Sequence, residues 1–131
     1  MPAGLLDTSV VIDWHDPSII DKLPDEMAIS AITAAELTAG PLLAKTPIEA
    51  ARRQARLQEV EMVLEPIPFD AAAVRSYGLI VAAVVSEGRK PRSRLANLLI
   101  AATAHANGLD LYSRNANDFI GLEGIVRVVA V

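Results

Sequence analysis

The sequence predicts an α/β fold, in which a compact, mostly parallel central sheet is flanked by helices on both faces. Short apolar segments alternate along the chain with longer segments rich in helix-forming residues, and this alternation is typical of parallel sheets. Prolines and glycines stand at the borders between these segments. The chain has 131 residues, of which 52% are hydrophobic and 21% charged, which suits one packed domain over residues 1–131.

The first part of the chain predicts two strand–helix units. Residues 3–7 form an apolar segment that ends in an acid, and a short helix follows it. Residues 27–30 are the second predicted strand, and the alanines and leucine of the next segment favour a helix. Because glycine and proline end helices, we expect this helix to stop at Gly40 and Pro41.

The second part of the chain predicts three longer helices and the remaining strands. Residues 46–65 carry the clearest helix signal, with a threonine cap, proline at the first position and glutamate in the first turn. Residues 66–69 contain two prolines, which cannot donate to a central ladder, so they predict a short edge strand. The remaining predicted elements are helices at 71–86 and 94–106 and strands at 110–113 and 125–131.

The composition argues against several classes of protein. Without cysteine there is no disulfide framework, thiolate metal site or thiol nucleophile, and the chain suits a reducing cytoplasm, where we expect it to act. The longest apolar run, residues 79–85, is far shorter than the about 18 residues that cross a bilayer, and no leader opens the chain. The net charge of −4 argues against nucleic-acid binding through bulk positive potential, although a local basic patch still allows it.

Polar side chains are predicted to gather at one edge of the sheet. Asp7 ends the first strand, Glu36 lies in the helix after the second, Asn97 begins the helix at 94–106, and Asp118 follows the third strand. Ligands of parallel sheets bind beyond the carboxyl ends of the strands, so we expect these side chains to converge there. Each acid alone also fits a cap, a turn or a solvated helix, so the prediction depends on their joint placement. A carboxylate cluster without histidine or cysteine favours Mg²⁺ or Mn²⁺.

Other classes of protein with this topology carry sequence motifs that the chain lacks. There is no G-x-x-x-x-G-K-[ST] and no G-x-G-x-x-G, which argues against nucleotide hydrolases and dinucleotide-binding proteins. A phosphoaspartyl hydrolase would need a second acid two positions after Asp7, where Ser9 stands. Divalent-metal chemistry on phosphodiesters therefore remains the favoured reading.

Four segments occur in a characteristic order across nearly the whole chain: LLDTS at 5–9, TAAEL at 33–37, LLIAATA at 98–104 and SRNANDF at 113–119. Together they resemble the PIN-domain family, most closely the VapC-type toxins of bacterial toxin–antitoxin pairs. The resemblance implies a PIN fold and an Mg²⁺- or Mn²⁺-dependent endoribonuclease that hydrolyses RNA, of the tRNA or rRNA class, through metal-assisted attack of water. It also implies a VapB-like antitoxin as partner and a homodimer.

The resemblance also implies roles for individual residues. Asp7, Glu36 and Asp118 match acidic positions of the family, and Ser9 and Asn115 match polar positions that support the metal site.

Asn97 departs from the family, which usually has aspartate there. An amide oxygen can still bind Mg²⁺, but it brings no negative charge and cannot act as a base. We expect Asp7, Asn97 and Asp118 to hold the metal, with lower affinity and a lower rate than an all-acid site. A catalytically silent PIN-like module that binds RNA or antitoxin is the alternative, and a metal-dependent DNA nuclease or phosphatase is a weaker one.

Basic residues near this anionic site are needed to attract RNA. The segment before the helix at 94–106 is rich in them, and Arg114 is a further candidate; a solvated basic loop is the alternative interpretation. Because the chain has few aromatic residues, we expect phosphate contacts to matter more than base stacking. The predicted RNA-binding residues are Arg89, Lys90, Arg92, Arg94 and Arg114.

Overall fold

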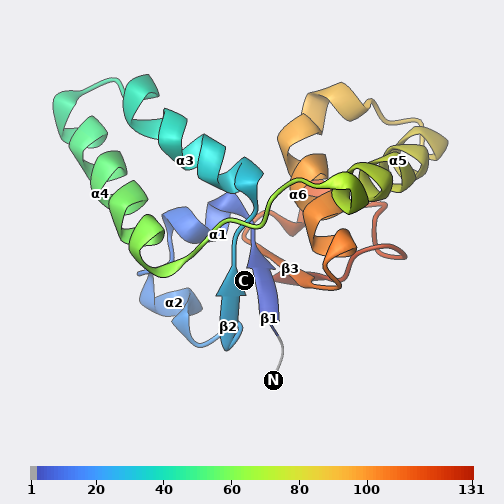
Figure 1. Cartoon of the computed structure of the whole chain (residues 1–131), viewed down its shortest axis with the longest axis horizontal. Helices are drawn as coiled ribbons and strands as arrows, with labels where there is room; N and C mark the ends of the chain where they lie inside the picture. Colours follow the sequence, from blue (N-terminus) through green and yellow to red (C-terminus); the bar gives the residue numbers. More distant parts are fainter. Residues whose placement is uncertain (1–2) are drawn as a thin grey trace.

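A computed structural model describes residues 3–131, apart from the side chain of Ser93. Within them, four strands form one parallel sheet in the order β2-β1-β3-β4, which confirms the predicted fold class. In Figure 1 the arrowheads of β1 and β2 point toward the side where the helices of the molecule diverge. The strands are β1 (Ala3–Leu6), β2 (Glu26–Ala28), β3 (Asp110–Ser113) and β4 (Val128–Ala130).

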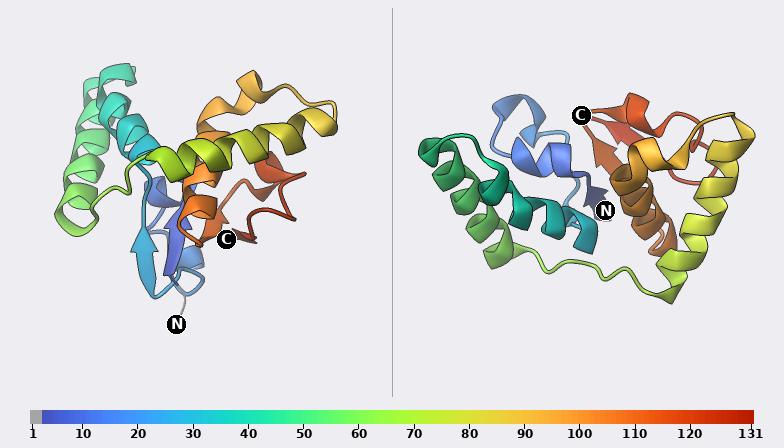
Figure 2. Two further views of the ribbon diagram at one scale, coloured as in Figure 1. Left: turned by 45° about the vertical axis from the view of Figure 1, so that its right-hand side comes forward. Right: turned by 90° about the horizontal axis from the view of Figure 1, so that it is seen from above.

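The helices form two arms beside the sheet. Figures 1 and 2 show α3 and α4 on one side of the strands and α5 and α6 on the other. No helix within residues 3–131 is both long and apolar enough to cross a membrane. The helices are α1 (Thr8–Ile12), α2 (Pro17–Ile20), α3 (Ala31–Leu43), α4 (Pro47–Val63), α5 (Ala71–Ser86) and α6 (Leu95–Ala106), with 3₁₀ turns η1 (Pro91–Arg94) and η2 (Ala116–Phe119).

The two central strands supply both halves of the core. Leu5 pairs with Leu111 across β1 and β3, and both pack with α5 and α6 on one face. The next pair, Leu6 and Tyr112, packs on the other face with α1, α3 and α4. Gly4 completes this packing, because a Cβ there would lie 2.4 Å from Cε1 of Tyr112. The alternation of side chains along β1 therefore explains why helices cover both faces of the sheet.

The end predicted for the helix after the second strand is wrong. Helix α3 runs through Gly40 and Pro41 to Leu43 instead of stopping there. Proline removes one backbone donor, but in the last turn of a helix it forfeits a single hydrogen bond, and its fixed φ suits the helix. The carbonyl of Pro41 then accepts the N–H of Ala44, which closes the helix.

Three predicted strands are shorter in the structure. The predicted edge strand at 66–69 is reduced to one isolated bridge, in which Ile67 exchanges hydrogen bonds with the backbone of Ile29 and Ala31, because the flanking prolines cannot donate. The second strand ends at Ala28, because Ser30 caps α3 instead. The last strand begins only at Val128, since residues 125 and 126 donate to the carbonyl of Leu122 in a turn.

Candidate active site

Asp7 lies at the carboxyl end of β1 and is only 4% exposed. Its backbone N–H donates to the carbonyl of Tyr112, which continues the pairing of the two central strands. Oδ1 accepts the backbone N–H of Thr8 at 2.8 Å, and Oδ2 accepts the hydroxyls of Ser9 at 2.9 Å and Ser113 at 2.8 Å. Hydrogen bonds to a charged acceptor are strong, so these donors offset the cost of burying the carboxylate.

The hydroxyls of Ser9 and Ser113 also position the segment after β3. Ser9 Oγ accepts the N–H of Arg114 at 3.2 Å, and Ser113 Oγ accepts the N–H of Asn115 at 2.9 Å. Asp7 is thereby connected through two hydroxyls to the residues that lead into η2. Of the two predicted supporting residues, Ser9 contacts Asp7 through its hydroxyl, whereas Asn115 takes part only through its backbone N–H. Sequence reasoning missed Ser113, whose signal was a polar residue at the end of the strand beside β1.

Glu36 is joined to this group through Thr8. The carboxylate of Glu36 is exposed on α3, and its Oε1 accepts the hydroxyl of Thr8 at 2.6 Å. The same hydroxyl lies 3.0 Å from that of Thr33, which is fully buried. The structure therefore brings Asp7 and Glu36 to one edge of the sheet, as expected, through two threonines that the sequence did not single out.

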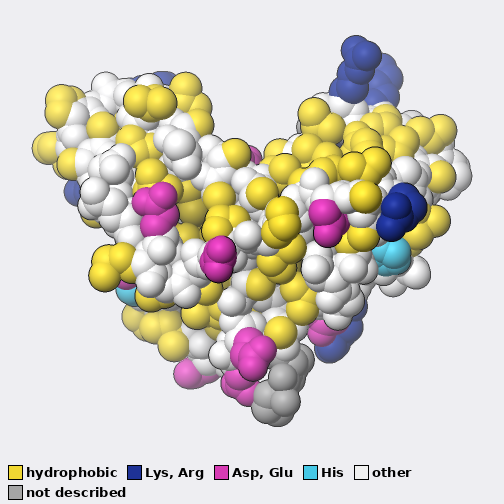
Figure 3. Space-filling model, viewed as in Figure 1, with side chains coloured by type: hydrophobic (Ala, Val, Ile, Leu, Met, Phe, Trp, Pro, Cys, Tyr) yellow, Lys and Arg dark blue, Asp and Glu magenta, His cyan; other side chains and the backbone are white. Residues whose placement is uncertain are grey.

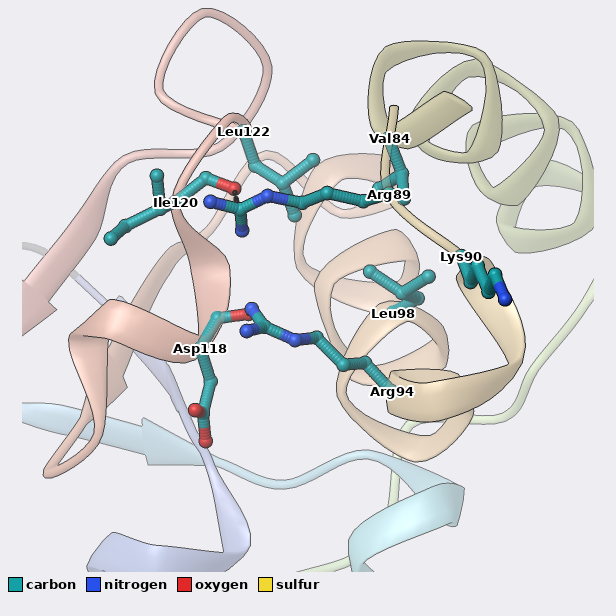
Figure 4. A pocket seen from close by; sticks show the side chains of 8 residues that line it. All are labelled: Val84, Arg89, Lys90, Arg94, Leu98, Asp118, Ile120 and Leu122. Atoms are coloured by element: carbon teal, nitrogen blue, oxygen red, sulfur yellow. Dashed lines mark hydrogen bonds between the residues drawn. The ribbon is translucent and has the colours of Figure 1, made fainter. Parts of the chain in front are cut away.

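Asp118 and Asn97 lie on the side of the molecule that carries α5 and α6, and within the described residues no hydrogen bond joins either side chain to Asp7 or Glu36. Asp118 lies in η2, and its main-chain carbonyl accepts Nη1 of Arg94 at 2.6 Å. Figure 4 shows its carboxyl group directed away from that guanidinium. Asn97 lies in the first turn of α6 and is partly buried. Among the described groups, neither of these two side chains has a hydrogen-bond partner, so their oxygens are available to a ligand.

The acids do not form a tight cluster. Within residues 3–131, no three Asp, Glu or His side chains lie close enough together to hold one metal ion. The candidate donors are nevertheless all oxygen atoms, and they come from the end of β1, from η2 and from the first turn of α6. Oxygen donors of this kind bind hard divalent cations.

Arg114 is held in an ion-pair network. Its Nη1 lies 3.1 Å from Oδ2 of Asp16 and 3.4 Å from Oδ2 of Asp13, in the connection between α1 and α2. Hydrogen bonds from the backbone N–H and the side chain of Ser18, and then from Arg114, lower the pKa of Asp16 to about 2. The charge of Arg114 is thus locally balanced by acids.

Three of the other predicted basic residues, Arg89, Lys90 and Arg94, line a pocket on the opposite arm. Arg89 lines it and donates from Nη1 to the carbonyl of Ile120 at 3.1 Å, whereas Arg92 is exposed outside it. Figure 3 shows basic side chains at the tip of this arm, across a notch from the α3–α4 arm. The pocket, here called the basic pocket, has a volume of about 410 Å³ and is lined by Val84, Arg89, Lys90, Arg94, Leu98, Asp118, Ile120 and Leu122 (Figure 4).

Comparisons of the sequence and of the structure with known proteins identify the same family. Residues 4–122 match the PIN domain. The chain is 35% identical to ribonuclease VapC5 of Mycobacterium tuberculosis over 128 residues, which are 96% of this chain and 92% of that protein.

Solved structures extend this likeness to the fold. The crystal structure of VapBC-5, a toxin–antitoxin system of the same organism, matches with a TM-score of 0.86 and 34% identity over 100% of both chains. VapBC2 from Rickettsia felis, bound to a DNA fragment from its promoter, matches with a TM-score of 0.77 and 25% identity over 98% of both chains. The chain therefore belongs to the PIN-domain family and, within it, to the VapC proteins.

Proposed function

We propose that this chain is a metal-dependent endoribonuclease and the toxin of a VapBC-type toxin–antitoxin pair. The observation that carries the proposal is the buried carboxylate of Asp7, held by three donors at the carboxyl end of a central strand. A packed core gains nothing from a charge at this position, whereas a metal-assisted hydrolase needs one. The 35% identity to a protein named a ribonuclease supports this reaction class.

The residues proposed to hold the metal are Asp7, Asn97 and Asp118. An ionised carboxylate has about four lone-pair sites, and Asp7 uses three of them, which leaves room for a ligand. Mg²⁺ is usually bound through one or two carboxylates and keeps several waters, so a site without three clustered acids still suits Mg²⁺ or Mn²⁺. When bound, such an ion stabilises charge on a phosphodiester and lowers the pKa of a water.

The remaining steps are assigned to residues of the chain. Glu36 is exposed and oriented by Thr8, and we assign it the proton of the attacking water. Ser9, Ser113 and Asn115 fix the position of Asp7 and of the segment that leads to Asp118. Asn97 contributes an oxygen without charge, so the rate should be lower than with aspartate.

The proposed partners are a VapB-like antitoxin, an RNA of the tRNA or rRNA class, and a second copy of the chain in the cytoplasm. The similar VapBC structures are named as toxin–antitoxin systems, which supports the first of these. Large apolar side chains exposed on the α3–α4 arm are the kind of surface that a protein partner covers: Leu42, Leu43, Ile48, Met62 and Val63.

Asn97 supports one second candidate function, a silent PIN module that binds antitoxin or RNA without cutting it. The amide removes one negative charge, and the described residues offer no group of three acids to replace it. Both effects weaken metal binding.

Cleavage of a pool of tRNA and rRNA with Mg²⁺ or Mn²⁺ separates the two functions. We expect the natural chain to cut slowly and the Asn97→Asp variant to cut about tenfold faster or more, because a ligand charge is restored. Asn117→Asp is the matched control, since it adds the same charge at an exposed position of η2. Cleavage by the Asn97→Asp variant alone would mean an inactivated toxin, and cleavage by neither protein would support the silent module.

A further inference from the structure

We propose that the basic pocket binds one unpaired nucleotide of the RNA, adjacent to the nucleotide at the cleaved bond. This inference rests on the proposed function and adds a substrate subsite to it. The pocket volume of about 410 Å³ lies within the range of small-molecule sites, roughly 300–1,000 Å³. A single nucleotide fits such a space, whereas a base-paired helix does not.

The walls of the basic pocket suit a nucleobase. Val84, Leu98 and Leu122 are buried and form the apolar floor of the pocket, and Ile120, which is 45% exposed at the rim, is the most accessible apolar side chain of the lining. No aromatic side chain lines the pocket within the described residues, so the base would pack against these walls and the planar guanidinium groups. Unstacked bases are offered by single-stranded loops, which is why the nucleotide is unpaired.

The arginines of the pocket suit the phosphate. Figure 4 shows Arg89 and Arg94 extending side by side toward the η2 segment, and each uses one donor for a main-chain carbonyl. A guanidinium has five N–H donors, so both retain donors for a phosphate. Because the carbonyls already hold them in place, little further side-chain freedom is lost on binding.

Among the described residues no acid forms an ion pair with Arg89 or Arg94, although the carboxylate of Glu87 lies beside Gly121, next to the pocket. The carboxyl group of Asp118 points away from the guanidinium of Arg94 (Figure 4). Glu123 is the acid whose charge interacts with Arg89, but backbone N–H groups of Glu123 and Gly121 are the larger causes of its lowered pKa. Its carboxylate is therefore occupied mainly by the backbone.

Asp118 places the basic pocket next to the proposed chemistry. Its carbonyl accepts Arg94 inside the pocket, while its carboxyl group, a proposed metal ligand, points away from that guanidinium. Asp118 thus belongs to both regions, through its main chain to the basic pocket and through its carboxyl group to the proposed metal site. RNA that presents a phosphodiester to the acids would bring a neighbouring nucleotide to the pocket.

The test is a titration of isotope-labelled protein with ribonucleoside 5′-monophosphates, followed by backbone amide NMR without metal or RNA. We expect shifts in the amides of residues 89–98 and 118–122. Ile120→Glu should weaken binding about tenfold, because it places a negative charge at the rim of the pocket, close to the guanidinium of Arg89 that is proposed to bind the phosphate. Ile20→Glu is the matched control, with the same charge change at a similarly exposed residue of α2, 51% against 45%; it should change affinity less than about twofold.

The proposal would be overturned if no amide signals shifted at the pocket, or if both variants weakened nucleotide binding equally. It would also be overturned if inorganic phosphate bound as tightly as the nucleotide, because the base would then contribute nothing. Free nucleosides serve as the complementary probe and should bind more weakly than the monophosphates. Cleavage of the RNA pool by the Asn97→Asp protein tests the proposed function separately. If that protein cuts RNA but nucleotides do not bind at the pocket, the nuclease function stands and the subsite is wrong.

Discussion

The two aspartates of the candidate site are held by different groups: Asp7 by its side chain and Asp118 by its main chain. On one side, Asp7 is fixed through its own carboxylate, which accepts three hydrogen bonds. On the other, Asp118 is fixed through its main-chain carbonyl by Arg94, while its carboxyl group has no partner among the described residues. Folding alone therefore orients Asp7, whereas a bound ligand must orient Asp118.

This difference separates stability from ligand binding. The donors around Asp7 are buried or partly buried, so a change there should affect folding as well as chemistry. A change near Asp118 should act mainly on what binds. The following predictions test this division, in order of decreasing effect.

The largest effect is expected from Asp7→Ala, made in the Asn97→Asp protein. Loss of the central carboxylate should reduce the single-turnover rate of RNA cleavage by about a thousandfold or more, since it removes a metal ligand. The free energy of unfolding should also fall by about 1–3 kcal/mol, because Ser113 and Thr8 lose their buried acceptor.

Asp25→Ala is the control for this prediction. Asp25 is an exposed acid just before β2, at the opposite edge of the sheet, and its removal should leave the rate unchanged. If Asp7→Ala retained cleavage within about tenfold, Asp7 would not be a metal ligand of the reaction.

Arg94→Gln is expected to have an intermediate effect, on metal binding by the protein without RNA. Loss of the hydrogen bond to the carbonyl of Asp118 should let η2 move and weaken Mn²⁺ binding by about threefold to tenfold in calorimetry. Removing a positive charge alone should instead favour a cation. Arg92→Gln, with the same charge change at an exposed neighbour, should therefore leave Mn²⁺ affinity unchanged or slightly higher. Weakening of equal size in both variants would refute a positioning role for Arg94.

The sequence was sufficient for the fold class and for placing Asp7 and Glu36 at one edge of the sheet, because both depend on local patterns, but the tight carboxylate cluster that it favoured is not found among residues 3–131. The order of apolar and helical segments predicts the parallel sheet, and Asp7 and Glu36 occupy the edge that the topology predicts. The hydroxyl of Ser113 was missed, because it acquires its role only through the pairing of β3 with β1, 106 residues away from Asp7 along the chain.

Charge was the least predictable feature, since it depends on tertiary partners. Arg114 stays a predicted RNA contact, but its guanidinium forms ion pairs with Asp13 and Asp16, which the sequence pattern did not predict. The end of α3 was wrong for a different, local reason: Pro41 disfavours a helix interior, yet it is tolerated in the last turn of the helix. The ion pair of Arg114 with Asp16 leads to the smallest of the predicted effects.

Asp16→Asn should remove a small, pH-dependent contribution to stability from the Asp7 side of the site. The pKa of Asp16 is lowered to about 2 in the folded protein, against about 3.9 for an unfolded aspartate. A lowered pKa stabilises the fold above the unfolded value and ceases to do so as the pH falls through the folded value. The difference in unfolding free energy between the natural chain and the variant should therefore be constant above about pH 5 and shrink toward pH 2.

Urea unfolding from pH 2 to pH 6 measures this difference, and Arg114→Gln identifies its source. Hydrogen bonds from Ser18 are the larger causes of the shift and Arg114 a smaller one, so Arg114→Gln should reduce the pH dependence without abolishing it. A difference that did not vary with pH would contradict the ionised network. If the pH dependence is found, protonation of Asp16 at low pH weakens its ion pair with Arg114. Because the backbone N–H of Arg114 donates to the hydroxyl of Ser9, acid then acts first on the Asp7 side of the site, which folding alone holds in place.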